Sequence, residues 1–125
     1  MRIGVDLLPV DSLDRLHSRG WFTRYIYAPA ELAEANAMTG SRRKEYLAGR
    51  FAAKEAVLKV IGTGLLRGVT PRDIAVVRSE SGAPRTALCG SAERAATAAG
   101  ISHLTVSITH SRDMIAAVAF GWKAP

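Results

Sequence analysis

The sequence predicts an α+β fold in which an antiparallel sheet packs against one long central helix and shorter helices. Helical patterns lie mainly in the first part of the chain and strand patterns mainly in the last part. The longest helical pattern runs from residue 41 to about residue 61, and two apolar strand patterns lie near the C-terminus. At 125 residues the chain fits one domain, which we expect to span residues 1–125.

The N-terminal part of the chain is expected to form one strand followed by helices. The expected elements are a strand over 2–8, a short helix over 10–18, an extended or irregular aromatic stretch over 21–27, a helix over 30–37 and the long helix over 41–61. Pro29 suits the first position of its helix, and Ser41 is the expected N-cap of the long helix.

The C-terminal part is expected to supply most of the sheet. The expected elements are a glycine-rich loop over 62–68, strands over 73–78 and 85–88, an alanine-rich helix over 91–100 that Ser91 caps, and strands over 104–109 and 114–122. Leu104, Val106 and Ile108 alternate with hydroxyl residues, which is the period of a half-buried strand. The last strand is apolar almost throughout, which predicts burial on both faces.

Composition limits the classes of partner and compartment. Hydrophobic residues make up 48% of the chain, which indicates a folded protein, and the net charge of +6 favours an anionic partner. Nucleic acid, a membrane surface, a phosphorylated ligand and an acidic protein all fit this charge, but no nucleic-acid-binding motif is present. Cys89 is the single cysteine, which excludes an internal disulfide. With no signal peptide and no apolar run of spanning length, we expect a soluble cytoplasmic protein that does not enter a membrane.

The long helix carries charged residues on every face. Glu55 and Lys59 fall on a face otherwise made of alanines, whereas Arg50 and Lys54 fall among large apolar residues. A surface helix usually separates its apolar and charged residues. The pattern therefore predicts a helix that holds a charged ligand or packs in an oligomer.

Two carboxylates are candidate ligands of a hard cation. Asp6 interrupts an apolar strand, and Glu55 would lie beside it if that strand packs on the long helix. Mg²⁺ is typically held by one or two carboxylates together with substrate phosphates. A strand-end carboxylate that caps a turn, and a plain Glu55–Lys59 helix pair, remain the structural alternatives. Gly62, Thr63 and Gly64 follow the helix and fit either a helix C-cap or a ligand-binding loop.

Ser107, Thr109 and His110 form a polar cluster at a strand end. Their spacing does not match a catalytic triad, and the hydroxyl and imidazole groups fit phosphate binding. The three histidines of the chain show no metal-ligand spacing.

Three sequence blocks together resemble the holo-acyl-carrier-protein synthases, the short, trimeric class of 4′-phosphopantetheinyl transferases. The blocks are Ile3–Asp6, the helical segment Ala48–Lys59 with the following Gly62-Thr63-Gly64-Leu65, and Val106–His110. A Gly82-Ala83-Pro84 turn stands where the family has its Gly-x-Pro. The resemblance covers essentially the whole chain, and its middle block is highly specific.

The resemblance implies an enzyme that moves the phosphopantetheine arm of coenzyme A to a serine of an acidic apo acyl carrier protein and releases adenosine 3′,5′-bisphosphate. It implies that Asp6 and Glu55 bind Mg²⁺ and that Lys59 neutralises phosphate charge. The implied coenzyme contacts are Arg50, Gly62, Thr63, Gly64, Pro84, Ser107, Thr109 and His110. The last three are expected to act across a subunit interface of a homotrimer. Arg50 and Lys54 are interpreted as coenzyme or interface contacts.

Four positions depart from the family pattern, and two of them are Thr109 and Ser111, where Ser and Asp are more usual around His110. Pro9 stands where the family usually has glutamate, and Ser12 stands where it usually has an arginine that contacts the carrier. The implied metal and coenzyme residues are intact. A coenzyme-A-binding relative with lost or altered transferase activity is therefore the second hypothesis, and a basic nucleic-acid-binding protein is a remote third. Arg15 is the candidate to take over the role of the missing arginine at position 12. The candidate contacts for an acidic carrier are Arg15, Arg19, Arg24 and the basic cluster 42–44.

Overall fold

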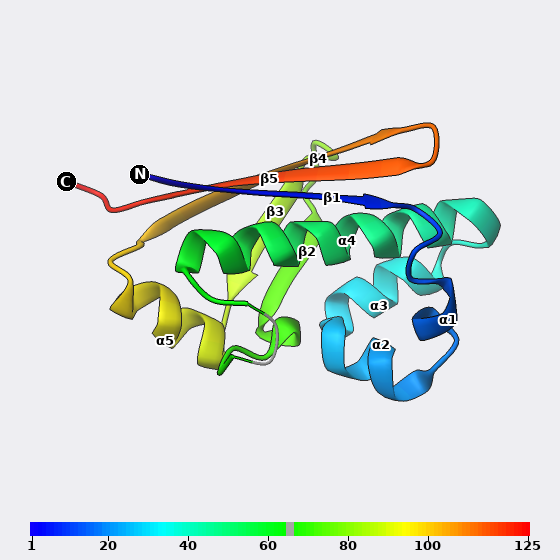
Figure 1. Ribbon diagram of the computed structural model, residues 1–125, viewed down its shortest axis with the longest axis horizontal. Coiled ribbons are helices and arrows are strands. Elements are labelled where there is room, and N and C mark those ends of the chain that lie inside the picture. Colours follow the sequence, from blue (N-terminus) through cyan, green and yellow to red (C-terminus); the bar gives the residue numbers. More distant parts are fainter. Residues whose placement is uncertain (65–66) are drawn as a thin grey trace.

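The computed structural model describes residues 1–64 and 67–125 and shows a three-stranded antiparallel sheet lying along one long helix (Figure 1). The sheet order is β1-β5-β4, in which β5 (Met114–Trp122) is hydrogen-bonded to both β1 (Arg2–Pro9) and β4 (His103–Ser111). The long helix is α4 (Gly40–Ile61), and it packs on all three strands. The predicted antiparallel sheet on a long helix is confirmed.

The remaining elements pack around the rest of α4. They are α1 (Asp14–His17), α2 (Gly20–Ile26), α3 (Pro29–Asn36), the 3₁₀ turn η1 (Pro71–Asp73), the hairpin strands β2 (Ile74–Arg78) and β3 (Pro84–Leu88), and α5 (Gly90–Ala98). Helix α4 therefore runs through the middle of the molecule, between the sheet and the shorter helices, while the β2–β3 hairpin crosses behind it and β3 contacts β4 (Figure 1). Within the described residues, no helix is long and apolar enough to cross a bilayer.

Several local predictions are corrected by the structure. The aromatic stretch is the helix α2, because Phe22 and Ile26 lie one turn apart and both bury their side chains. The helix expected over 10–18 is limited to α1. The N-cap of α4 is Thr39, and the N-cap of α5 is Cys89 in place of Ser91. Part of the predicted glycine-rich loop, residues 65–66, lies outside the described residues.

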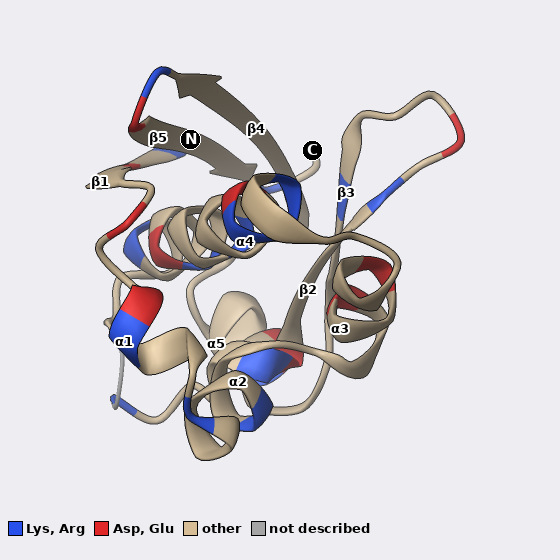
Figure 2. Cartoon of the chain, turned by 90° about the vertical axis from the view of Figure 1, so that its right-hand side faces the viewer, with Lys and Arg blue, Asp and Glu red and all other residues tan. Residues whose placement is uncertain are grey.

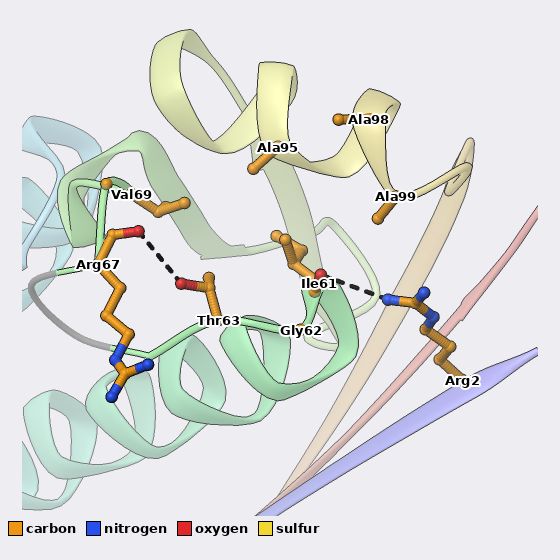
Figure 3. Close-up of a pocket in the computed structure, with 10 residues that line it drawn as sticks. Arg2, Ile61, Gly62, Thr63, Arg67, Val69, Ala95, Ala98 and Ala99 are labelled. Atoms are coloured by element: carbon orange, nitrogen blue, oxygen red, sulfur yellow. Dashed lines mark hydrogen bonds between the residues drawn. The ribbon is translucent and has the colours of Figure 1, made fainter.

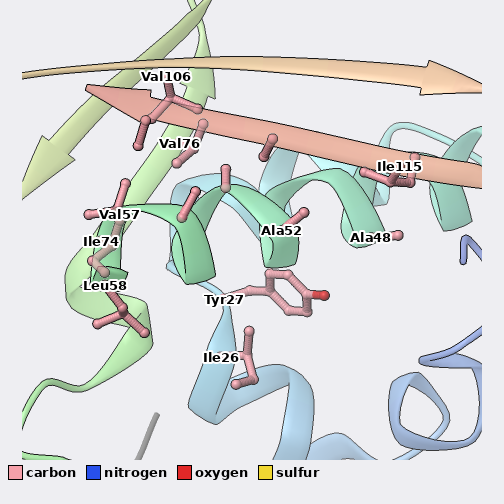
Figure 4. Packing of buried hydrophobic residues seen from close by; sticks show 14 of the residues in the cluster. Ile26, Tyr27, Ala48, Ala52, Val57, Leu58, Ile74, Val76, Val106 and Ile115 are labelled. Atoms are coloured by element: carbon pink, nitrogen blue, oxygen red, sulfur yellow. The ribbon is translucent and has the colours of Figure 1, made fainter. Parts of the chain in front are cut away.

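Small residues let the sheet approach α4 closely. Ala52 and Ala56 on the helix and Ala117 and Ala119 on β5 are fully buried, with larger apolar side chains filling the core around them (Figure 4). Gly4 on β1 lies so close to α4 that a Cβ atom there would sit 2.0 Å from the Ala56 carbonyl oxygen. The alanine face of the helix is therefore the surface on which the sheet rests.

Gly4→Ala is expected to push β1 away from α4. The added methyl group overlaps backbone, which cannot rotate away as a side chain can, so we expect a loss of about 1–3 kcal/mol in the free energy of unfolding. Urea denaturation followed by circular dichroism measures this loss. Gly64→Ala is the matched control, because a Cβ there has no neighbour within 4 Å. Equal stability of the two variants would contradict the close packing.

Side chains form hydrogen bonds with the backbone N–H and C=O groups along the open edge of β2. Glu31 and Glu34 of α3 accept hydrogen bonds from the backbone N–H groups of Val76 and Arg78. Arg50 and Lys54 of α4 donate to the carbonyl oxygens of Val76 and Ile74. These contacts, which we call the β2 edge ladder, occupy the positions that a neighbouring strand would fill. Two acidic side chains from α3 and two basic side chains from α4 make these contacts. The interpretation of Lys54 as a coenzyme or interface contact is wrong, because its side chain is buried inside this ladder.

Glu31 and Lys54 form a fully buried ion pair at the centre of the β2 edge ladder. The Lys54 ammonium lies 2.7 Å from Glu31 Oε1 and also donates to the Pro71 carbonyl oxygen. Burial lowers the pKa of Lys54, and the Glu31 carboxylate opposes that shift. Glu31 further accepts from the N–H of Ala28. Each polar atom of the pair thus has a partner, which is the condition under which buried charges are tolerated.

Candidate functional site

Asp6, Glu55 and Lys59 meet where β1 crosses the C-terminal half of α4. Asp6 lies on the same face of β1 as Gly4 and Leu8, and this face is turned toward the helix. The Lys59 ammonium donates to the Val5 carbonyl oxygen at 2.6 Å and lies 3.3 Å from Asp6 Oδ1. The close approach at Gly4 brings these groups together. The predicted packing of the first strand on the long helix is confirmed.

Glu55 is the unsatisfied member of this group. Its Oε1 atom is buried and has no hydrogen-bond partner among the described residues. Burial raises the pKa of Glu55, the negative charge of Asp6 raises it further, and Lys59 partly opposes the shift. An unpaired buried carboxylate oxygen is costly. A cation or a proton donor bound at Glu55 would therefore remove this cost.

A divalent cation fits this pair of carboxylates. It would relieve the repulsion between Asp6 and Glu55 and would give the buried Oε1 atom a partner. Among the described residues, no group of three or more His, Cys, Asp or Glu side chains could enclose a metal by itself. Two carboxylates with the remaining positions left to water and substrate are typical of Mg²⁺, which keeps much of its hydration shell.

Gly62 and Thr63 lie beyond the end of α4, on the side that faces α5. Gly62 is the C-cap of the helix, with φ at +92° and its N–H bonded to the Leu58 carbonyl oxygen. Both residues line an open hollow of about 560 Å³, with Arg2 at one side and alanines of α5 opposite (Figure 3). Arg2 donates to the Val60 and Ile61 carbonyl oxygens. Gly64, the third residue of the predicted loop, directly follows Thr63.

Arg50 and Pro84 lie near the β2–β3 hairpin, away from Asp6. Arg50 belongs to the β2 edge ladder, and its guanidinium carbon lies 4.1 Å from the centre of the Tyr46 ring. Pro84 begins β3 opposite Arg78, two residues along β2 from the Val76 carbonyl that accepts the Arg50 bond. Sequence reasoning missed both neighbours of Arg50: Tyr46 stands four residues earlier on the same helix, and this spacing could have pointed to it, whereas Glu34 lies on α3 and no local pattern links it to α4.

The predicted polar cluster of β4 is divided between two faces of the sheet. Ser107 and Thr109 pair with Val118 and Ala116, on the face turned away from α4. His110 lies on the other face, where its Nε2 atom is 3.7 Å from Glu45 Oε1. Glu45 precedes Glu55 by about 15 Å along the helix, at about 1.5 Å per residue. Within one chain, the three β4 residues therefore do not join the Asp6–Glu55–Lys59 group.

Pro9 and Ser12, two of the positions that depart from the family pattern, serve internal contacts. Ser12 donates its hydroxyl to the Pro9 carbonyl oxygen at 2.7 Å and closes the turn that follows β1. Lys44 of α4 binds Asp11 within this turn and Asp14 at the start of α1. Lys44 is thus neutralised by its own chain, whereas Arg15 and Arg19 stay exposed.

Comparison with known proteins decides the family. The sequence profile of the 4′-phosphopantetheinyl transferase superfamily matches residues 2–119. The chain belongs to this superfamily. The family suggested by the three sequence blocks is therefore confirmed, and with it the prediction that the chain is a transferase of the holo-acyl-carrier-protein synthase type.

Relatives of this transferase match it over most of its length. A holo-[acyl-carrier-protein] synthase from Nitratidesulfovibrio vulgaris is 39% identical over 122 residues, which cover 93% of each chain. The Plasmodium yoelii acyl carrier protein synthase with ADP bound has a TM-score of 0.88 at 30% identity and covers 99% of this chain and 96% of its own. The Bacillus anthracis synthase in complex with CoA (3′,5′-ADP) has a TM-score of 0.82 at 28% identity, covering 98% of this chain and 96% of its own. The predicted fold class is confirmed by these structures.

Proposed function

We propose that this transferase moves the 4′-phosphopantetheine arm of coenzyme A to a serine hydroxyl of an apo acyl carrier protein and releases adenosine 3′,5′-bisphosphate. The observation that carries the proposal is the buried, unpartnered Oε1 atom of Glu55 beside Asp6, with Lys59 one turn further along α4. Two carboxylates and one ammonium group are what a magnesium pyrophosphate requires. The family membership supplies the reaction class.

Each residue of this group has a distinct role in the proposed reaction. Asp6 and Glu55 would hold Mg²⁺, which supplies Lewis-acid stabilisation of charge on the pyrophosphate. Lys59 neutralises charge on the departing phosphate, and its bond to the Val5 carbonyl keeps the ammonium beside Asp6. Phosphoryl transfer depends on positioning and charge neutralisation more than on covalent help from the protein. The rigid contact between β1 and α4 supplies that positioning.

A second copy of the chain is proposed to complete the coenzyme site. The face of the sheet turned away from α4 exposes Ile3, Val5 and Leu7 by 57%, 52% and 63%. Thr105, Ser107 and Thr109 lie at the opposite edge of the sheet, in the same rows. Each of them pairs with the same β5 residue as its counterpart on β1. A copy that covers the apolar part of this face brings the hydroxyl groups of β4 to the rim of the interface. This arrangement supports the proposed homotrimer, in which Ser107 and Thr109 bind the coenzyme of a neighbouring chain.

Leu7→Glu is expected to dissociate the oligomer. A charge placed in an apolar interface loses its hydration on assembly without gaining a partner. Sedimentation velocity should then show monomers, and transferase activity should fall with the loss of the shared site. Thr97→Glu on the exposed side of α5 adds the same charge and serves as the control. An unchanged oligomer in Leu7→Glu would contradict this interface.

The basic surface is proposed to attract the acidic carrier protein. Arg15, Arg19 and Arg24 are exposed, and Figure 2 shows basic positions on the segment that contains α1 and α2. Opposite charges on two partners raise the rate at which they meet.

Cys89 is the single cysteine, and the absence of an internal disulfide supports a reducing compartment such as the cytoplasm.

One assay tests the proposed reaction. The protein is incubated with coenzyme A, Mg²⁺ and a panel of apo carrier proteins, and mass spectrometry measures the gain of a phosphopantetheine group on each carrier. We expect this gain on at least one carrier and none after chelation with EDTA. Coenzyme binding by calorimetry without any gain would favour a coenzyme-binding relative that has lost transferase activity. The absence of coenzyme binding would overturn both hypotheses.

A further inference from the structure

The Glu34 carboxylate is placed beside Arg50 by contacts that do not involve Arg50. Both carboxylate oxygens face the backbone N–H of Arg78, at 3.0 and 3.4 Å. The Tyr46 hydroxyl also donates to Glu34 Oε1. These two donors from β2 and α4 fix the carboxylate in its position. Its charge is therefore held near the Arg50 guanidinium whether or not the two groups bind each other.

The contact between Glu34 and Arg50 is electrostatic and leaves the donors of Arg50 available. Arg50 Nη2 lies 3.9 Å from Glu34 Oε1, which is too long for a hydrogen bond. The recorded hydrogen bond of the guanidinium runs from Nε to the Val76 carbonyl oxygen at 2.9 Å. Among the described residues, the buried side-chain atoms without a partner are Glu55 Oε1 and Thr86 Oγ1. Among the described residues, the terminal N–H groups of Arg50 make no hydrogen bond, and the 9% of this side chain that stays exposed is the part a ligand can reach.

This geometry gives Arg50 a reduced attraction for anions. Val76 and the Tyr46 ring hold the guanidinium in one orientation, so its free donors point in a fixed direction. Glu34 places a negative charge within about 4 Å of the same group, in a setting where both side chains are largely buried. Partial burial strengthens such a charge–charge effect relative to water. A phosphate group that approaches Arg50 is attracted by the guanidinium and repelled by the carboxylate.

We infer that Glu34 is a positioning residue that weakens the affinity of Arg50 for a phosphate group of the coenzyme. The inference rests on the proposed function, in which Arg50 is a coenzyme contact. Glu34 acts through Arg50 and sets the strength of binding without touching the reacting atoms. Weaker binding favours release of the bisphosphate product, which carries the same phosphate groups as the coenzyme.

A purely structural role makes the opposite prediction. If Glu34 only satisfies the N–H of Arg78 and the Tyr46 hydroxyl, its loss would loosen the β2 edge and raise the KM for coenzyme A. Glu34→Gln separates the two roles, because the amide keeps an oxygen acceptor and removes the charge. We expect Glu34→Gln to lower the KM for coenzyme A roughly twofold to tenfold with kcat unchanged or reduced by slow product release.

Direct binding measurements give a second readout. Isothermal titration with adenosine 3′,5′-bisphosphate should show tighter binding to Glu34→Gln than to the wild type, and the difference should shrink as salt is raised. Glu93→Gln, an exposed change on α5, alters the net charge equally and should leave the affinity unchanged. In the Arg50→Gln background, the effect of Glu34→Gln should disappear, as a double-mutant cycle requires for coupled residues. If Arg50→Gln does not fold, a salt series of Glu34→Gln against Glu93→Gln decides whether the gain in affinity comes from the charge at Glu34 or from the net charge.

Two results would overturn the inference. The first is unchanged or weaker bisphosphate binding in Glu34→Gln at a wild-type melting temperature. The second is an equal gain in affinity in Glu93→Gln, which would assign the effect to net charge. Failure of the proposed function looks different, because the wild-type protein itself would then bind no coenzyme and modify no carrier.

Discussion

Glu55→Gln is expected to reduce the transfer rate roughly 100-fold or more while leaving the protein as stable as the wild type. Glutamine has nearly the same shape, so the packing of α4 against β1 is kept. It lacks the negative charge that would hold Mg²⁺ together with Asp6. The loss of that charge also removes the two effects that raise the pKa of Glu55, first the burial of the charge and then its repulsion by Asp6. Stability is therefore expected to be unchanged or slightly increased.

Two measurements check the role of Glu55. The rate of carrier modification is followed at saturating coenzyme and increasing Mg²⁺, and thermal unfolding is followed with and without Mg²⁺. Glu93→Gln is the matched control on an exposed helix face. Glu55→Gln should lose both the activity and the stabilisation that Mg²⁺ gives to the wild type. A variant that keeps full activity at low Mg²⁺ would show that Glu55 is not a metal ligand.

Lys54→Met is expected to be the most destabilising single change described for this fold. It leaves the fully buried Glu31 carboxylate without its charged partner and removes a hydrogen bond to the Pro71 carbonyl. Breaking a buried pair in this way costs about 3–5 kcal/mol in the free energy of unfolding. Urea denaturation measures the loss as a shift of the midpoint.

The double variant Lys54→Met with Glu31→Gln tests whether the loss of stability comes from the unpaired, buried Glu31 carboxylate. We expect it to be more stable than Lys54→Met alone, because no unpaired carboxylate is then buried. It should remain less stable than the wild type, because Glu31 also accepts from the backbone of Ala28 and Val76. A loss below 1 kcal/mol in Lys54→Met would mean that water reaches Glu31.

The sequence predicted the central architecture because the relevant signals are local. The long helical segment that ends before Gly62 and the alternation in β4 are visible within single segments, and the structure confirms both. The helix α2 was missed because its seven residues carry an aromatic run that also suits a strand. Only its packing on the core decides between the two conformations.

The candidate site was predictable in part for the same reason. Glu55 and Lys59 stand out within one helix, and Asp6 stands out within one strand. Arg50 and Lys54 were equally conspicuous, but their partners Glu31, Val76 and Ile74 lie far away in the sequence. A charged residue among apolar neighbours on a helix can indicate a bound ligand, or it can indicate a hydrogen bond to a backbone group far away in the sequence. A single sequence does not distinguish these two cases. The division of Ser107 and His110 between two faces of β4 likewise depends on the register of the sheet.

The β2 edge ladder also affects which surfaces of the protein can join other chains. A strand with free N–H and C=O groups offers a template on which any extended peptide can add, and this route leads to open-ended aggregates. Four side chains occupy those groups on β2, so an incoming strand would first have to break buried ionic contacts. The hairpin is thereby protected against uncontrolled growth from this edge. The homotrimer proposed above would use a different surface, the apolar face of the larger sheet, and a closed ring of copies has a defined size.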